Sequence, residues 1–236
     1  MRRLHAENIV RESKLLMLKY QLSPHFFLNA LNSVTSLVRK DKKKDAIEML
    51  ARIGDFLRSS MYSDDSPEHT LRDEMEILSQ YIDIEKVRFG DRLNVEFSVS
   101  EDAKSVEIPN LLLQPLIENS IKHAVCRSLS PTTIRLEAAL DRNGKRLDIA
   151  LSDTGPGANA DRFKTSTASG IGLKNVEERL RSAYGEGGYA FAIEPGNEKG
   201  LTVRLSIPCA PRQQHSREKI GEDGAAIGLV TQKGLM

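Results

Sequence analysis

Apolar residues spaced three and four positions apart constrain the N-terminal part of this chain more than any other feature. They recur in this way over residues 15–38, which predicts a long amphipathic helix. Pro24 interrupts the pattern and is expected to kink the helix or to begin a new one, with Ser23 as its N-cap. After a charged loop at residues 39–45, a second periodic stretch covers residues 47–61. Together the two stretches predict a helical hairpin.

A lone helical hairpin has little against which to bury its apolar stripe. Pairing with a second copy, as a four-helix bundle, would bury the apolar stripes of both chains against each other. We therefore expect a homodimer.

Composition and charge exclude several classes of protein. The 236 residues include 34 Lys and Arg against 33 Asp and Glu, a net charge of +1, so no global basic field attracts nucleic acid. No apolar run reaches the roughly 18–20 residues of a membrane span. Two cysteines, Cys126 and Cys209, are too few for a disulfide framework or a thiolate zinc site. We expect a cytoplasmic protein that neither binds nucleic acid directly nor crosses a membrane by itself.

The pattern changes beyond residue 66. Thr70 and Asp73 resemble a capping box that opens a third helix, which should end near Phe89. Downstream, the spacing of apolar residues predicts helices at 110–124 and 171–183 and strands at 95–99, 132–140, 146–152, 189–194 and 201–207. The predicted fold class is α+β. A helical hairpin (1–66) precedes an α/β sandwich (67–209) and a polar, mobile tail (210–236).

A polar cluster marks the predicted helix at residues 110–124. Glu118, Asn119, Lys122 and His123 lie together on and beside one face. The amide oxygen of Asn119 is a hard ligand suited to Mg²⁺, and Lys122 suits a phosphate group. The alternative is an ordinary amphipathic helix with solvated polar residues.

Two glycine-containing segments follow this helix. Asp153 stands at a strand end before Gly155 and Gly157, where a carboxylate can accept a hydrogen bond from an exocyclic amine and glycines let backbone approach a flat ring. Gly170 and Gly172 enter a helix, whose first N–H groups bind phosphate oxygens. Each segment taken alone could equally be a plain turn or helix start.

The three segments, in this order and context, resemble the N, G1 and G2 boxes of the Bergerat-fold (GHKL) ATPases, which have a mixed sheet. The resemblance implies that ATP and Mg²⁺ bind here. It assigns Asn119 to the metal, Asp153 to the adenine amino group, and His123 to the pocket edge. It further implies nucleotide-binding roles for Lys122, Gly155, Gly157, Gly170, Gly172, Leu173 and Thr202.

The sequence of the hairpin resembles one class of GHKL proteins in particular. Residues 18–33 (LKYQLSPHFFLNALNS) are similar to the phosphoacceptor block of LytS-type sensor histidine kinases, and residues 81–93, 109–123 and 170–180 match further blocks. The resemblance implies that His25, the only histidine between residues 15 and 61, accepts the phosphoryl group of ATP. The phosphoryl group would then pass to an aspartate of a response regulator, often one with a LytTR domain.

Two further residues receive catalytic roles. Asn29 lies four positions after His25 on the same helix face, and the resemblance implies that it orients the water that hydrolyses the regulator's phospho-aspartate. The alternative is that Asn29 bonds a neighbouring helix or caps a turn distorted by Pro24. Many other histidine kinases have an acidic residue directly after the phosphoacceptor, but this chain has Phe26. The sequence therefore does not identify the general base for His25, and Glu118 is a candidate for it.

The predicted function is that of an ATP-dependent protein-histidine kinase of a two-component system. The alternatives are another GHKL ATPase, against which the hairpin argues, and a degenerate kinase that serves as a dimeric scaffold. The sequence leaves no room for a sensor domain ahead of the hairpin, so we expect that the chain is a fragment, that a separate protein supplies the signal, or that the signal acts directly on the helices.

Overall fold

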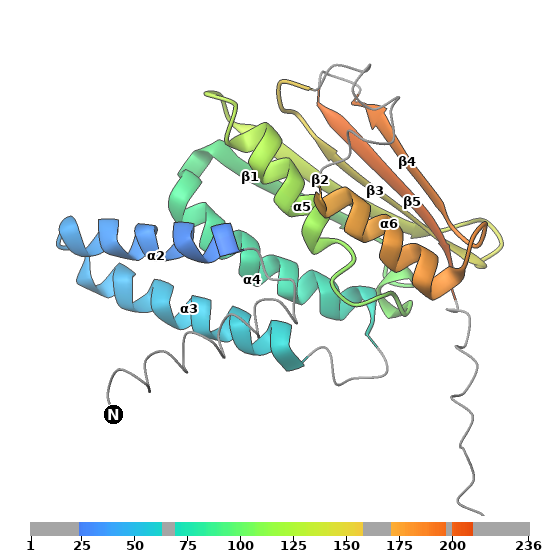
Figure 1. Ribbon diagram of the computed structural model, residues 1–236, viewed down its shortest axis with the longest axis horizontal. Helices are drawn as coiled ribbons and strands as arrows, with labels where there is room; N and C mark the ends of the chain where they lie inside the picture. The colour runs from blue at the N-terminus through green and yellow to red at the C-terminus, as the bar shows by residue number, and fades with distance from the viewer. Residues whose placement is uncertain (1–23, 63–68, 158–170, 197–199, 210–236) are drawn as a thin grey trace, which may run out of the picture.

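The computed structural model describes residues 24–62, 69–157, 171–196 and 200–209. Ser23, Gly170 and the predicted tail at 210–236 lie outside these residues. Figure 1 shows a helical hairpin beside a layer of helices packed on a sheet.

The predicted hairpin is confirmed, with helices α2 (Pro24–Arg39) and α3 (Lys43–Tyr62). Pro24 is the first described residue of α2, so the kink or new helix start expected at this proline stays a prediction. The connection is shorter than the charged loop predicted at 39–45, because α3 already begins at Lys43 and carries Asp45 in its first turn. A carboxylate in the first turn favours helix over loop through the helix dipole.

Helix α4 (Leu71–Phe89) begins with the predicted capping box. The Thr70 N–H donates to Asp73 Oδ2 (2.8 Å), and the Asp73 N–H donates to Thr70 Oγ1 (3.3 Å). The helix packs against the hairpin, where the Phe26 ring centroid lies 5.2 Å from that of Phe56 and 4.7 Å from that of Tyr81. Part of the hairpin's apolar stripe is thus buried within one chain.

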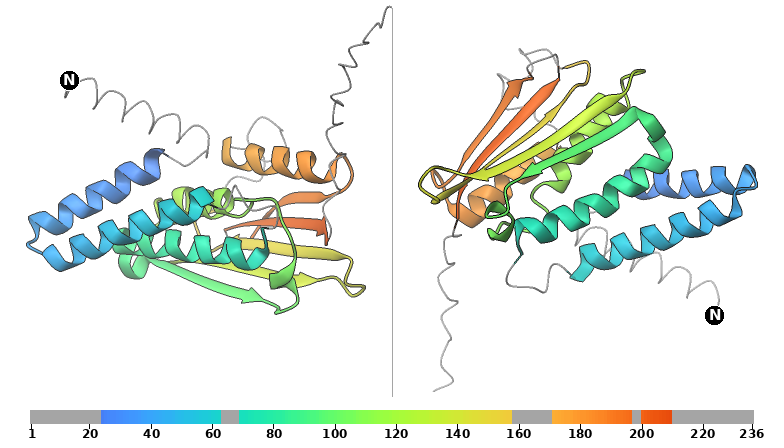
Figure 2. Two further views of the ribbon diagram at one scale, coloured as in Figure 1. Left: turned by 90° about the horizontal axis from the view of Figure 1, so that it is seen from below. Right: turned by 180° about the vertical axis from the view of Figure 1, so that it is seen from behind.

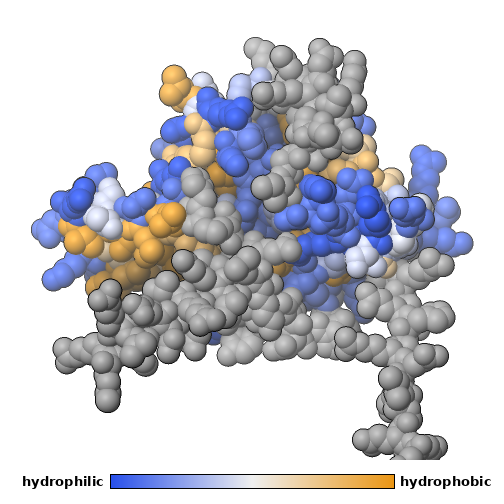
Figure 3. Space-filling view, viewed as in Figure 1, coloured by the Kyte–Doolittle hydropathy of each residue, from blue (hydrophilic) through white to orange (hydrophobic). Residues whose placement is uncertain are grey.

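The rest of that stripe is exposed. Figure 3 shows apolar surface gathered over α2 and α3. The large exposed side chains there are Leu28 (62%), Leu31 (51%), Val38 (58%), Ile47 (65%) and Leu50 (49%).

The sheet is mixed, as predicted, with the order β1-β2-β3-β5-β4. β1 and β2 are parallel, whereas the other neighbouring strands are antiparallel. The strands are β1 (Leu93–Val99), β2 (Thr132–Leu140), β3 (Arg146–Asp153), β4 (Ala190–Pro195) and β5 (Leu201–Pro208). Short 3₁₀ turns, η1 (Gly90–Arg92) and η2 (Ala103–Ser105), flank β1.

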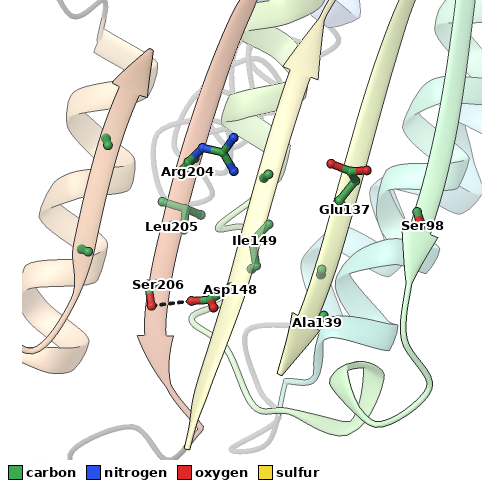
Figure 4. Close-up of a pocket in the computed structure, with 12 residues that line it drawn as sticks. Ser98, Glu137, Ala139, Asp148, Ile149, Arg204, Leu205 and Ser206 are labelled. Carbon is green, nitrogen blue, oxygen red and sulfur yellow. Dashed lines mark hydrogen bonds between the residues drawn. The ribbon is translucent and has the colours of Figure 1, made fainter. Parts of the chain in front are cut away.

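Three helices that follow the hairpin cover one face of this sheet, as the views from below and behind show (Figure 2). They are α4, α5 (Gln114–Ser120) and α6 (Ile171–Tyr184), and Ile134 and Leu136 of β2 are fully buried beneath them. The opposite face carries Glu137, Asp148 and Arg204 beside small residues, and Ser206 Oγ donates to Asp148 Oδ1 at 2.6 Å (Figure 4).

The helix predicted at residues 110–124 starts later than expected. Leu111 has a left-handed backbone (φ 52°), so α5 begins only at Gln114, with Pro115 in its first turn. After Ser120 the helix widens into a π-helix, η3 (Ile121–Val125). The backbone is therefore irregular just before α5 and again directly after it, close to the predicted metal and phosphate ligands.

A buried carboxylate from α4 fixes the start of α5. Glu74 is fully buried, and it accepts hydrogen bonds from the N–H groups of Leu111 (2.9 Å), Leu113 (2.9 Å) and Gln114 (3.2 Å). His69 Nε2 lies 2.8 Å from Glu74 Oε2. Arg179 of α6 donates to the carbonyls of Asn110 and Leu111 from the other side. The turn before α5 is therefore held by one anion and one cation.

We predict that Glu74→Gln lowers the free energy of unfolding by roughly 2–5 kcal/mol, because the amide replaces a charge on which three buried N–H groups and His69 converge. Urea denaturation followed by circular dichroism measures the change. Glu76→Gln, at an exposed position on the same helix, is the matched control and should stay within about 0.5 kcal/mol of the parent. A Glu74→Gln chain as stable as the control would contradict the role given to this carboxylate.

Candidate functional site

A cavity of about 350 Å³ lies where the hairpin, α4, α5, η3 and the start of α6 meet. Six residues predicted from the sequence line it: Asn29, Glu118, Asn119, Lys122, His123 and Gly172. The fold thus brings the segment after the expected phosphoacceptor to the same cavity as the expected metal and phosphate ligands. The side chain of His25 itself lies outside the described residues.

The polar residues of α5 and η3 form one wall. Glu118 Oε1 accepts a hydrogen bond from Gln114 Nε2 at 2.8 Å, and burial raises the pKa of this carboxyl although the hydrogen bond opposes the shift. The wider π-helical turn carries Lys122 and His123 to the same wall. Burial, and the charges of Arg127 and Lys122, lower the pKa of His123, so its neutral form is favoured.

Asp153 lies against the buried side of α5, at the end of β3. Its Oδ2 accepts from Ser120 Oγ (3.3 Å) and its Oδ1 from the Gly155 N–H (3.0 Å). Burial raises its pKa, while these hydrogen bonds oppose the shift. Because Ser120 follows Asn119 directly, the predicted adenine-reading and metal-binding residues belong to neighbouring parts of one region. Thr202 is also buried and pairs with Ser152 of β3.

The space around the Cβ position differs between two glycines of this region. A Cβ on Gly155 would lie 2.3 Å from the Cβ of Ala124, so packing of the strand end on η3 requires glycine there. Among the described residues, the atom nearest to a Cβ on Gly172 would be the Pro115 carbonyl oxygen, at 3.7 Å. The protein itself therefore leaves space at Gly172, at the cavity and in the first turn of α6.

Two further predicted residues within the described part of the chain, Gly157 and Leu173, do not line the cavity. Gly157 is exposed with a left-handed backbone (φ 75°), and Leu173 is buried in the core at 3% exposure. Gly170 is outside the described residues. Their predicted nucleotide contacts remain predictions.

Sequence reasoning missed Glu85, which lines the cavity from α4. Its side chain is only 5% exposed, its Oε2 accepts no hydrogen bond from the described residues, and Arg88 Nη1 lies 3.7 Å away. Burial raises the pKa of Glu85 to about 7, with Glu118 adding to the shift and Arg88 opposing it. The signal was present in the sequence, because Tyr81, Glu85 and Arg88 are spaced four and three apart and share one helix face.

Comparison with known proteins assigns the two halves of this arrangement to one family. Residues 13–93 match the family described as "Histidine kinase", and residues 105–211 match "Histidine kinase-, DNA gyrase B-, and HSP90-like ATPase". The chain belongs to the histidine kinases. It is of the LytS type with a GHKL ATPase domain, as its motifs predicted.

Several sensor histidine kinases are similar over most of the chain. Sensor histidine kinase YesM of Bacillus subtilis is 32% identical over 201 residues, which is 85% of this chain and 34% of that protein. BtsS of Escherichia coli is 32% identical over 199 residues, covering 84% and 34%. Sensor protein LytS of Staphylococcus epidermidis is 28% identical over 221 residues, covering 90% and 36%. The chain thus spans about a third of the length of these relatives.

The described part of this histidine kinase chain can be examined for membrane-spanning helices and for groups of metal ligands. Across the residues that the structure describes, no helix has the length and apolar character to cross a membrane. The same residues contain no group of three or more His, Cys, Asp or Glu that could hold a metal ion.

The buried state of Glu85 predicts a pH-dependent stability. The folded pKa of about 7 exceeds the ordinary value of 4.5, so between these values the unfolded chain releases a proton that the folded chain keeps. Stability from this group is present below about pH 4.5 and is lost as the pH rises through 7. We predict that Glu85→Gln stabilises the chain relative to the parent by up to about 3 kcal/mol more at pH 8 than at pH 4.5.

The measurement is urea denaturation of both chains at the two pH values, with Glu76→Gln as the exposed control on the same helix. Taking the difference between variant and parent cancels the other titrating groups. A difference that does not change with pH would show that Glu85 is ionised in the fold like an ordinary surface glutamate.

Proposed function

We propose that this chain transfers the γ-phosphoryl group of ATP to His25 and then to an aspartate of a response regulator. The observation that carries the proposal is the cavity that Asn29 of α2 shares with Asn119, Lys122 and Gly172. A histidine kinase needs its phosphoacceptor helix to lie beside its nucleotide site. An ATPase without a phosphoacceptor does not need this arrangement, and neither does a helical bundle without a nucleotide site.

The residues present fit Mg-ATP. Mg²⁺ retains waters and takes few protein ligands when a nucleotide supplies phosphate oxygens, so the amide oxygen of Asn119 suffices without a metal-binding cluster. Lys122 and the first N–H groups of α6 would hold the phosphates, and Asp153 would accept from the adenine amino group. Mg²⁺, when bound, supplies charge neutralisation of the phosphates.

Glu118 and Glu85 are carboxyl groups that line the cavity, and in this proposal one of them would take the proton released at His25. Asn29 would orient the water that removes the phosphoryl group from the regulator. The exposed apolar residues of α2 and α3 favour a homodimer through a four-helix bundle. We further propose a cytoplasmic location, a regulator of the LytTR type, and a signal supplied by a separate region or protein.

We predict that His25→Gln abolishes labelling by ATP that carries radioactive γ-phosphate, while ATP affinity measured by calorimetry is unchanged. The label on the parent chain should be acid-labile and base-stable, as a phosphorus–nitrogen bond requires. His215→Gln, a histidine to which no role is assigned, is the control and should label normally. Normal labelling of His25→Gln would reject His25 as the acceptor, and no label on the parent chain would favour the non-catalytic scaffold.

We predict that Gly172→Ala weakens ATP binding at least tenfold, about 1.4 kcal/mol, because its methyl group would stand where a phosphate approaches the first turn of α6. Folding should not suffer, since the nearest described atom to the new Cβ is 3.7 Å away and alanine favours helix. Gly54→Ala is the matched control, a helical glycine of α3 whose Cβ position has no atom of the described residues within 4 Å. Calorimetry measures both affinities, and equal affinities for the two variants would contradict the phosphate site.

A further inference from the structure

In a dimer, ATP bound to one chain has two possible phosphoryl acceptors, the histidine of the same chain and the histidine of the partner. Both walls of the cavity come from the same chain, with Phe26 and Asn29 on one side and Asn119, Lys122 and Gly172 on the other. His25 directly precedes Phe26 in α2 and lies one helical turn before Asn29, so its backbone position is on the helix face that borders the cavity.

The first turn of α2 is held in this place by packing within the chain. Phe26 is only 3% exposed, and its ring contacts those of Phe27 (5.2 Å), Phe56 (5.2 Å) and Tyr81 (4.7 Å). Aromatic contacts at these centroid distances are favourable and specific in geometry. The residue next to His25 is therefore anchored to α4.

The nucleotide wall is anchored to the same helix. Glu74, two turns before Tyr81 on α4, accepts three N–H bonds from the start of α5, and α5 carries Asn119. One helix thus fixes both the start of the phosphoacceptor helix and the start of the metal-binding helix. Both walls of the cavity are therefore positioned by contacts with α4 of the same chain.

The surface available to a partner copy is a different one. Leu28 and Leu31 of α2 are 62% and 51% exposed, and neither lines the cavity. Dimerisation through these residues leaves the contact of Phe26 with Tyr81 in place. The partner's nucleotide site is not needed to complete the cavity.

We infer that phosphoryl transfer occurs in cis, from ATP bound to a chain to His25 of that same chain. This inference rests on the proposed function. A nitrogen lone pair of the neutral imidazole forms the new bond to the γ-phosphorus, and the bond to the β–γ bridging oxygen breaks. ADP leaves with that electron pair, and the proton released by the imidazole goes to the carboxylate of Glu118 and from there to water.

Mixed dimers test the inference. Chains with different affinity tags are co-expressed, dimers that carry both tags are purified, and each chain is examined for label after incubation with ATP radiolabelled at the γ-phosphate. In the first dimer one chain carries His25→Gln and the other Asn119→Asp. In the second dimer one chain is the parent and the other carries both substitutions.

Transfer in cis predicts no label in the first dimer, because neither chain holds both an acceptor and an intact nucleotide site. It predicts a labelled parent chain in the second dimer, at about half of the label of the parent homodimer. Label on the Asn119→Asp chain of the first dimer, or loss of label from the second, would overturn the inference. An unlabelled parent homodimer would instead count against the proposed function.

Discussion

The hydrogen bonds of Glu74 are the constraint on which the rest of the structure depends. A fully buried carboxylate is costly unless it is compensated, and here three backbone N–H groups and His69 surround it. Leu111 adopts a left-handed backbone that non-glycine residues disfavour, and it is held by Glu74 at its N–H and by Arg179 at its carbonyl. Because this turn is fixed, α5 starts at Gln114 and directs Glu118 and Asn119 into the cavity.

Helix α4 connects this turn with the rest of the molecule. Its first half carries Glu74, and its second half carries Tyr81 and Glu85, which meet the hairpin and the cavity. The cavity contains two carboxyl groups of raised pKa, the buried Glu85 and the half-buried Glu118, beside the cations Arg88 and Lys122. Carboxyl groups of raised pKa beside positively charged side chains are typical of sites that handle protons and phosphates.

Much of this arrangement could be predicted from the sequence. The spacing of apolar residues gave the helices and strands, and the capping box at Thr70 gave the start of α4 within one residue. The motifs gave the family and six residues that line the cavity, because glycines and amides at fixed spacing have few other uses.

What could not be predicted depends on contacts between distant residues. The start of α5 was placed at 110 because nothing local reveals that Glu74 and Arg179 hold residues 110–113 outside a helix. The spacing of Tyr81, Glu85 and Arg88 indicates that they share one helix face, but the burial of Glu85 on that face depends on packing against the hairpin and α5. The shortened connection at α3 shows that a run of charged residues can begin a helix as well as form a loop.

We propose that nucleotide binds between α5 and α6, on the helical side of the sheet. This can be tested by nuclear magnetic resonance of the chain labelled with nitrogen-15, titrated with a non-hydrolysable ATP analogue and Mg²⁺. We expect amide shifts concentrated at Asn119, Gly155 and Gly172, with Ser98 and Asp148 on the open face of the sheet unchanged (Figure 4). Shifts confined to the open face, or no shifts at saturating analogue, would contradict it.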